Sequence, residues 1–213
     1  LNDHIWPAEG AFVSEAFIAD GTQLAMAEML RTGTTTFSDM YFFPEIVAQL
    51  AHDVGMRAQI CFPLLDFPTP WGSGPDEYLS KGEAFIKQWR DNAFIMPAIG
   101  PHAPYTVSDE PLSKAVALSE ATGAPIQIHL HETAFEVEDA LEKSGKRPTA
   151  RLAELKVLGT NTQCVHMTQI DESDVALLQA TGAHVIHCPE SNLKLASGLS
   201  PVQTFRKAGV NVA

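Results

Sequence analysis

The chain has 213 residues, of which 45% are hydrophobic and 19% are charged, and this composition is typical of a globular domain. Its 14 Lys and Arg against 26 Asp and Glu give a formal net charge of -12, which disfavours binding to nucleic acid or to an anionic membrane surface. The three cysteines are widely spaced and no apolar run is long enough to span a membrane. We therefore expect a cytoplasmic protein with no nucleic-acid or membrane partner.

The first half of the chain alternates between amphipathic stretches and short apolar runs. Ser14 is a suitable N-cap for the first helix, and Gly33 is a suitable end to it. The pattern predicts helices over 14–32, 44–55 and 76–90, and strands over 34–42, 56–65 and 94–102.

The second half continues this rhythm. Asp171 and Asp174 resemble a capping box at the start of one helix, and Gly145 with Pro148 breaks another helical region. The pattern predicts helices over 108–123, 134–156, 171–182 and 200–208, and strands over 125–132, 162–168 and 184–190. The final VNVA reads as the beginning of a further strand, and the chain opens without Met, so we expect an internal section of a longer protein.

Strands that alternate with helices through short connections predict an α/β fold with a parallel sheet. Because the rhythm persists over about seven units, a closed barrel is favoured over an open sheet. The predicted fold is a (β/α)8 TIM-type barrel that lacks its first strand and the end of its last. The alternative is a doubly wound sheet, although the Gly-rich turn typical of that fold is absent from the sequence.

Histidines gather at the predicted carboxyl ends of strands, which is where barrels build active sites. These residues are His102, His129, His131, His166 and His187. Imidazole together with the carboxylate of Glu132 suits a catalytic zinc site, which leaves one position for water. Alternation along HLHE predicts that His129 and His131 face the same side, so that one imidazole binds metal. The alternative is a polar cluster held by hydrogen bonds.

Several segments resemble the amidohydrolase superfamily, and within it the 5-methylthioadenosine/S-adenosylhomocysteine deaminase group, which is related to the chlorotriazine hydrolases. The segments are LNDHIWPAE, DMYFFPE, GPHAPYTVS, HLHET, CVHMTQ and HCPESNLKLASG, and the resemblance covers almost the whole chain. It implies zinc-dependent hydrolytic deamination of an adenine nucleoside, with one Zn²⁺ per site or another divalent metal in its place.

The resemblance also implies a role for each matching residue. His129 corresponds to a metal ligand, and His166 corresponds to a catalytic histidine beside the metal and its water. Glu132 corresponds to a carboxylate that binds the purine and moves a proton to its ring nitrogen. His102 and Glu9 correspond to groups that contact the nucleoside and its ribose hydroxyls. We expect His187 and Asn192 only to shape a loop, which leaves them outside the catalytic set.

Three further metal-site groups of the family lie outside the sequence. Its HxH pair would precede Leu1, and its Asp would follow Ala213. Residues 1–213 therefore correspond to the central part of the barrel domain. The resemblance implies a small flanking β-sandwich formed by segments on either side, and the apolar faces of barrel helices favour a homo-oligomer.

The substrate is the finer question. S-adenosylhomocysteine carries a carboxylate that favours an Arg partner, and no Arg or Lys lies between Ala58 and Ser80. The segment instead offers apolar and aromatic residues, among them Phe62 and Trp71, so 5′-methylthioadenosine is preferred, with adenosine and S-adenosylhomocysteine as alternatives. A triazine or guanine-type hydrolase is a rival, although its substrate has no diol for Glu9. A catalytically inactive barrel used as a scaffold is the rival from another class.

Overall fold

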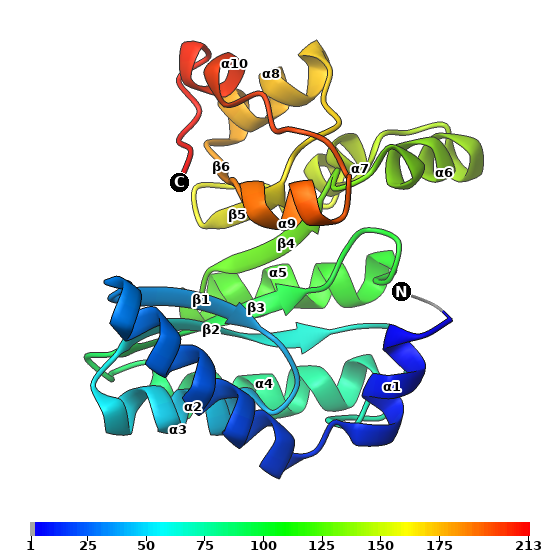
Figure 1. Ribbon diagram of the computed structural model, residues 1–213. Coiled ribbons are helices and arrows are strands. Elements are labelled where there is room, and N and C mark those ends of the chain that lie inside the picture. Colours follow the sequence, from blue (N-terminus) through cyan, green and yellow to red (C-terminus); the bar gives the residue numbers. More distant parts are fainter. Residues whose placement is uncertain (1–2) are drawn as a thin grey trace. The chain divides into compact units, whose positions relative to one another are not determined.

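The computed structural model describes residues 3–213, and the chain divides into two compact units, Leu1–Gly100 and Pro101–Ala213 (Figure 1). Both units consist of parallel strands connected by helices, as the sequence pattern predicts. Within residues 3–213, none of the helices combines the length and the apolar character needed to cross a membrane.

From residue 3 onward, the first unit contains four helices and three strands. They are α1 (Ile5–Phe12), α2 (Glu15–Thr32), β1 (Thr36–Met40), α3 (Pro44–Val54), β2 (Arg57–Leu64), α4 (Pro75–Trp89) and β3 (Ile95–Pro101), whose last residue lies just past the boundary between the units. β1 pairs with β2 in parallel, with Thr36 opposite Arg57 and Met40 opposite Cys61. β3 is the neighbour of β2 on its other side. The strands of this unit therefore follow chain order.

The core of the first unit is built around β2. Its residues from Ala58 to Leu64 are all buried, which is expected for a parallel strand covered on both faces. Helices α3 and α4 contact β2, and α2 packs on α3 (Figure 1). A Cβ at Gly82 of α4 would lie 2.3 Å from the ring of Phe62, so glycine at this position allows the helix to approach the strand.

The helix boundaries follow from local chemistry. Ser14 caps α2, because its hydroxyl oxygen accepts the backbone N–H of Phe17 at 3.3 Å. The same helix ends at Gly33, whose φ of 92° is costly for residues with a side chain. Asp171 and Asp174 form the predicted capping box at the start of the helix that follows them.

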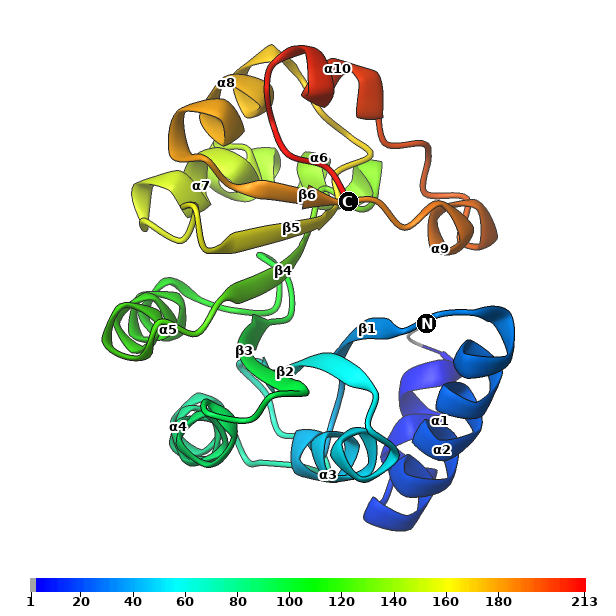
Figure 2. The same ribbon diagram turned by 90° about the vertical axis from the view of Figure 1, so that its left-hand side faces the viewer.

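The second unit contains the remaining elements. They are α5 (Asp109–Thr122), β4 (Ile126–Leu130), α6 (Ala134–Ser144), α7 (Pro148–Glu154), β5 (Thr162–His166), α8 (Glu172–Thr181), β6 (His184–Ile186), α9 (Pro189–Lys194) and α10 (Val202–Lys207). β4 pairs with β5 and β5 with β6, both in parallel. Helix α5 contacts β4, and α7 contacts α8 (Figure 2).

Two elements differ from the sequence prediction. Helix α1 was not predicted from the sequence. It buries no residue, and its sequence has no apolar face that repeats with the helical period. The strand predicted over 184–190 stops at Ile186, because Pro189 begins helix α9. VNVA does run beside β6, where Val212 forms an isolated parallel bridge with Val185.

Candidate active site

Three imidazoles come together in the second unit. His102 follows β3, His129 lies in β4 and His166 is the last residue of β5. The ring centroids of His102 and His129 are 5.2 Å apart, and those of His129 and His166 are 5.5 Å apart. The prediction that these three histidines meet at the ends of parallel strands therefore agrees with the structure.

Each of these three rings is held at its Nδ1 atom. Nδ1 of His102 is 2.9 Å from Thr106 Oγ1, and Nδ1 of His129 is 2.6 Å from the carbonyl oxygen of His102. Nδ1 of His166 is 2.8 Å from the side-chain oxygen of Asn192. Carbonyl and amide oxygens only accept hydrogen bonds, so Nδ1 of His129 and of His166 carries a hydrogen.

The surroundings keep two of the imidazoles neutral. Burial lowers the pKa of His129, and it lowers the pKa of His102 to about 4 with a smaller contribution from the charge of His129. A neutral imidazole that donates Nδ1–H to a carbonyl oxygen is the usual form of a metal-binding histidine. His129 therefore fits a metal ion at its Nε2 atom.

Glu132 lies just beyond β4 and faces His166. Its Oε1 atom is 3.5 Å from Nε2 of His166, and the two side chains are 20% and 6% exposed. His166 and the following Met167 have φ angles of 81° and 47°, in the left-handed region that costs energy for residues with a side chain. Such backbone geometry is frequent at functional sites, where surrounding contacts hold it in place.

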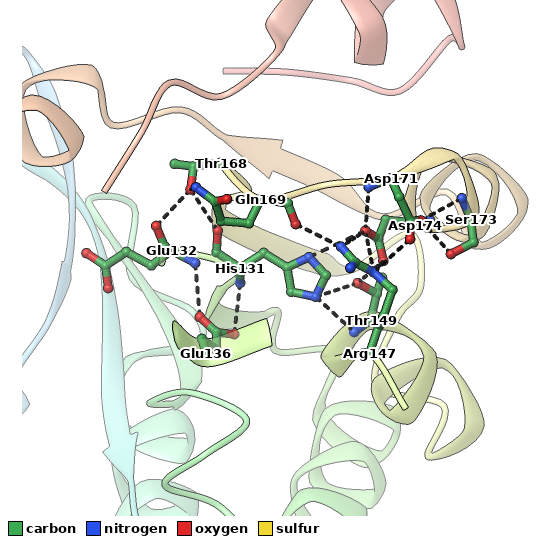
Figure 3. Close-up of polar contacts among 10 residues, drawn as sticks. All are labelled: His131, Glu132, Glu136, Arg147, Thr149, Thr168, Gln169, Asp171, Ser173 and Asp174. Carbon is green, nitrogen blue, oxygen red and sulfur yellow. Dashed lines mark hydrogen bonds and ion pairs between the residues drawn. The ribbon is translucent and has the colours of Figure 1, made fainter. Parts of the chain in front are cut away.

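His131 does not face the same side as His129, so this part of the prediction is wrong. The strand ends at Leu130, and His131 has a φ of 51°, so the strict alternation of a strand no longer applies. Its side chain is fully buried, with Nε2 2.9 Å from Thr149 Oγ1, whose hydroxyl donates to Asp174 at 2.7 Å (Figure 3). His131 is therefore a buried structural histidine.

A buried ion pair completes that cluster. Asp174 is fully buried, and the Nε atom of Arg147 donates to both of its oxygens at 3.0 and 3.1 Å (Figure 3). Arg147 also donates to the carbonyl oxygen of Gln169 at 2.9 Å. Sequence reasoning identified Asp174 only as a helix cap, because its partner lies 27 residues away and no local pattern connects them.

Asn192 does more than shape a loop. It is fully buried at helix α9, its side-chain oxygen accepts from His166, and its backbone oxygen accepts from Ser197 at 3.0 Å. The sequence indicated a role for Asn192 only by its position, because in HCPESNLKL this polar side chain comes close after the end of a strand. Asn192 therefore sets the orientation of the His166 ring.

Glu9 belongs to the first unit, in helix α1. Its carboxylate accepts a hydrogen bond from the hydroxyl of Tyr41, and burial followed by this contact raises the pKa of Tyr41. Burial also raises the pKa of nearby Asp39 to about 6, and the Oδ2 atom of Asp39 has no hydrogen-bond partner within residues 3–213. Sequence reasoning used the segment DMYFFPE only for its resemblance and missed both residues.

Within residues 3–213 no group of three or more His, Cys, Asp or Glu side chains is arranged to hold a metal ion. The structure contributes a neutral, anchored His129 with His166 and Glu132 beside it.

Comparisons with known proteins show which family and which structures the chain is similar to. Residues 2–213 match the model of the amidohydrolase family. The 5-methylthioadenosine/S-adenosylhomocysteine deaminases of Saccharophagus degradans and Teredinibacter turnerae are 61% and 51% identical over 211 and 213 residues, covering 99% and 100% of this chain. A crystal structure of an adenosine deaminase from Xanthomonas campestris with bound zinc has a TM-score of 0.97 and 44% identity, and the match covers all of this chain and 48% of that one.

The chain spans about half the length of the curated relatives it matches, with 47% and 48% of their residues covered. The parallel strands follow chain order within each unit, and the TM-score of 0.97 extends over the whole chain. The predicted fold, an incomplete (β/α)8 barrel, is thereby confirmed, and the doubly wound alternative is rejected.

Proposed function

This chain belongs to the amidohydrolase family, and from that premise we propose that it forms the central part of a zinc-dependent hydrolytic deaminase of an adenine nucleoside. The observation that carries the proposal is the row of anchored imidazoles beside Glu132, where two of the rings are neutral. The names of the relatives that are 61% and 51% identical support the same reaction class.

His129 would hold the metal through Nε2, with the remaining ligands supplied by parts of the protein outside this chain. Zinc supplies Lewis-acid chemistry, lowering the pKa of a water molecule toward about 7. His129 suits this role because the carbonyl oxygen of His102 fixes its ring and its tautomer. Zinc in the adenosine deaminase crystal structure supports this choice of metal.

Glu132 and His166 would handle the protons. Glu132 protonates the purine ring nitrogen next to the carbon that bears the amino group, because that nitrogen gains negative charge when water attacks the carbon. His166 presents Nε2 on the same side, 3.5 Å from Glu132 Oε1, and orients the attacking water. His102 contacts the nucleoside through its Nε2 atom, since its Nδ1 atom is engaged by Thr106.

Glu9 would bind the ribose hydroxyls, since a carboxylate accepts two such donors and a triazine or guanine offers no diol. Phe62 and Trp71 are buried in the core of the first unit, where the Trp71 ring lies beside the rings of Phe62 and Tyr78, so they do not form the apolar wall expected for a methylthio group. The segment 58–80 still offers no Lys or Arg to bind the carboxylate of S-adenosylhomocysteine. On this basis 5′-methylthioadenosine is the preferred substrate. The cytoplasmic location, the flanking β-sandwich and the homo-oligomer stay predictions.

The test uses the protein expressed from its complete reading frame and purified with zinc. Its substrates are 5′-methylthioadenosine, adenosine, S-adenosylhomocysteine, guanine and a chlorotriazine. Ultraviolet absorbance follows the conversion of adenine to hypoxanthine in the first three substrates and the spectral change of the ring in the other two. We expect the highest kcat/KM for 5′-methylthioadenosine. Glu132→Gln should lower kcat by about 100-fold or more, as is typical for a general acid. Glu138→Gln, which removes an exposed carboxylate from α6, should retain activity.

The other outcomes each overturn a part of the proposal. Turnover of guanine or the triazine alone would assign the protein to the rival hydrolases. Bound zinc without turnover of any substrate would contradict the proposed reaction, and a protein that binds no zinc would favour the inactive scaffold. A Glu132→Gln variant as active as the parent protein would remove Glu132 from the catalytic set.

A further inference from the structure

We propose that Glu136 is a positioning residue, whose carboxylate holds the backbone at Glu132 so that the Glu132 side chain reaches the reacting purine nitrogen; this inference rests on the proposed function. Glu136 lies in the first turn of α6 and is 4% exposed. Its Oε1 atom accepts the backbone N–H of His131 and its Oε2 atom accepts the backbone N–H of Glu132, both at 2.9 Å (Figure 3).

The backbone at His131 and Glu132 needs hydrogen bonds from outside strand β4 to keep its conformation. Strand β4 ends at Leu130, and His131 turns into the left-handed region with a φ of 51°. For a residue with a side chain this conformation costs about 1–2 kcal/mol. Without the Glu136 carboxylate, the N–H groups of His131 and Glu132 would lose these acceptors.

The carbonyl side of the same backbone is held from another segment. The hydroxyl of Thr168 lies 2.7 Å from the carbonyl oxygen of Glu132, its shortest contact with an acceptor, and the N–H of Thr168 donates to the carbonyl oxygen of His131 at 3.0 Å. The His131 side chain is fixed by Thr149 at 2.9 Å. The backbone around Glu132 is thus held on both its N–H and its carbonyl sides.

The Glu132 carboxylate itself is held loosely by comparison. Within residues 3–213, its single hydrogen-bond or ion-pair contact is with Nε2 of His166, at 3.5 Å. A group that must transfer a proton needs its reacting atom at hydrogen-bond distance from the substrate. The direction of the Glu132 side chain is therefore set mainly by its backbone, and Glu136 is the side chain that fixes that backbone at two adjacent N–H groups.

A carboxylate suits this role better than an amide of the same shape. Two parallel N–H donors require two acceptor oxygens, whereas Gln offers one oxygen and places an NH₂ group against the second N–H. Glu136→Gln should therefore release one of the two N–H groups. Because small displacements of a catalytic group cost up to about 100-fold in rate, we expect kcat to fall by about 10- to 100-fold.

The experiment compares Glu136→Gln and Glu136→Asp with Glu138→Gln, which makes the same charge change at an exposed position of the same helix. The complete protein is assayed with 5′-methylthioadenosine at pH 8, where Glu136 is ionised because burial raises its pKa only to about 7. We expect Glu136→Gln to lower kcat while KM stays within about threefold and zinc content is unchanged. Glu136→Asp, which keeps two oxygens, should retain more of the rate, and Glu138→Gln should keep all of it.

Hydrogen exchange gives a second readout that does not depend on activity. The backbone N–H groups of residues 131 and 132 should exchange faster in Glu136→Gln than in Glu138→Gln, measured by mass spectrometry on peptides spanning 130–133. Unchanged exchange, an unchanged kcat, a change confined to KM, or loss of zinc would each overturn the proposal. A parent protein without deaminase activity would refute the proposed function alone, and exchange would still decide whether Glu136 holds this backbone.

Discussion

Replacing Asp174 with Asn should lower the free energy of unfolding by about 3 kcal/mol, because the substitution removes one partner of a buried ion pair. Asp174 is fully buried, and its Oδ2 atom accepts from Arg147 and from the backbone N–H of Asp171 at 2.9 Å. Asn retains the Oδ1 acceptor for the hydroxyl of Thr149 but places an NH₂ group toward the other donors. The variant therefore loses the charge and at least two hydrogen bonds.

The expected loss of unfolding free energy depends on the contacts that Arg147 retains in the variant. Breaking a buried pair by removing one partner typically costs about 3–5 kcal/mol. Arg147 is 20% exposed, donates to Gln169 and lies 3.2 Å from the carboxylate of Asp171, so part of its charge stays compensated. This places the expected loss at the lower end of that range.

Urea unfolding followed by far-ultraviolet circular dichroism measures the loss, provided that the slope with denaturant stays the same. Glu172→Gln is the matched control, because Glu172 is exposed in the first turn of the same helix α8. The control should change the unfolding free energy by about 0.5 kcal/mol or less. If Asp174→Asn lost no more than the control, the buried carboxylate would not be stabilising this unit.

Three further predictions concern the site and its support. Asn192→Leu should lower kcat about 10-fold or more with little change in KM, because the His166 ring loses the acceptor of its Nδ1–H, and an unchanged kcat would contradict this role. Burial raises the pKa of Glu136 from 4.5 to about 7, so the folded protein keeps a proton that the unfolded chain releases between these pH values. The stability associated with this proton is present below pH 4.5 and is lost as pH rises through about 7. In the parent protein the free energy of unfolding in urea should therefore fall by up to about 3 kcal/mol from pH 5 to pH 8, and Glu136→Gln should remove this fall. An equal fall in both proteins would refute the reasoning. Glu9→Gln should raise KM for 5′-methylthioadenosine about 10-fold, more than it lowers kcat, and steady-state kinetics showing an unchanged KM would exclude ribose binding by this carboxylate.

The sequence by itself determined most of the element boundaries and the fold class. Ser14, Asp171 and the glycines that end helices act on backbone groups within a few residues, so their effect is readable without tertiary structure. The meeting of His102, His129 and His166 was also predictable, since parallel strands connected through helices end on the same side. The family resemblance then suggested roles for these residues that no local pattern contains.

Only the tertiary structure decided how each imidazole is used. HLHE predicts the same side for His129 and His131, but the backbone turns after Leu130 and His131 becomes part of a buried cluster with Asp174. That turn depends on contacts from residues that follow much later, such as Thr168, whose N–H donates to the carbonyl oxygen of His131. Periodicity describes a chain only while its strand or helix continues. At this strand end the conformation is set by hydrogen bonds from outside the strand, both from nearby Glu136 and from distant Thr168, which alternation along the strand does not encode.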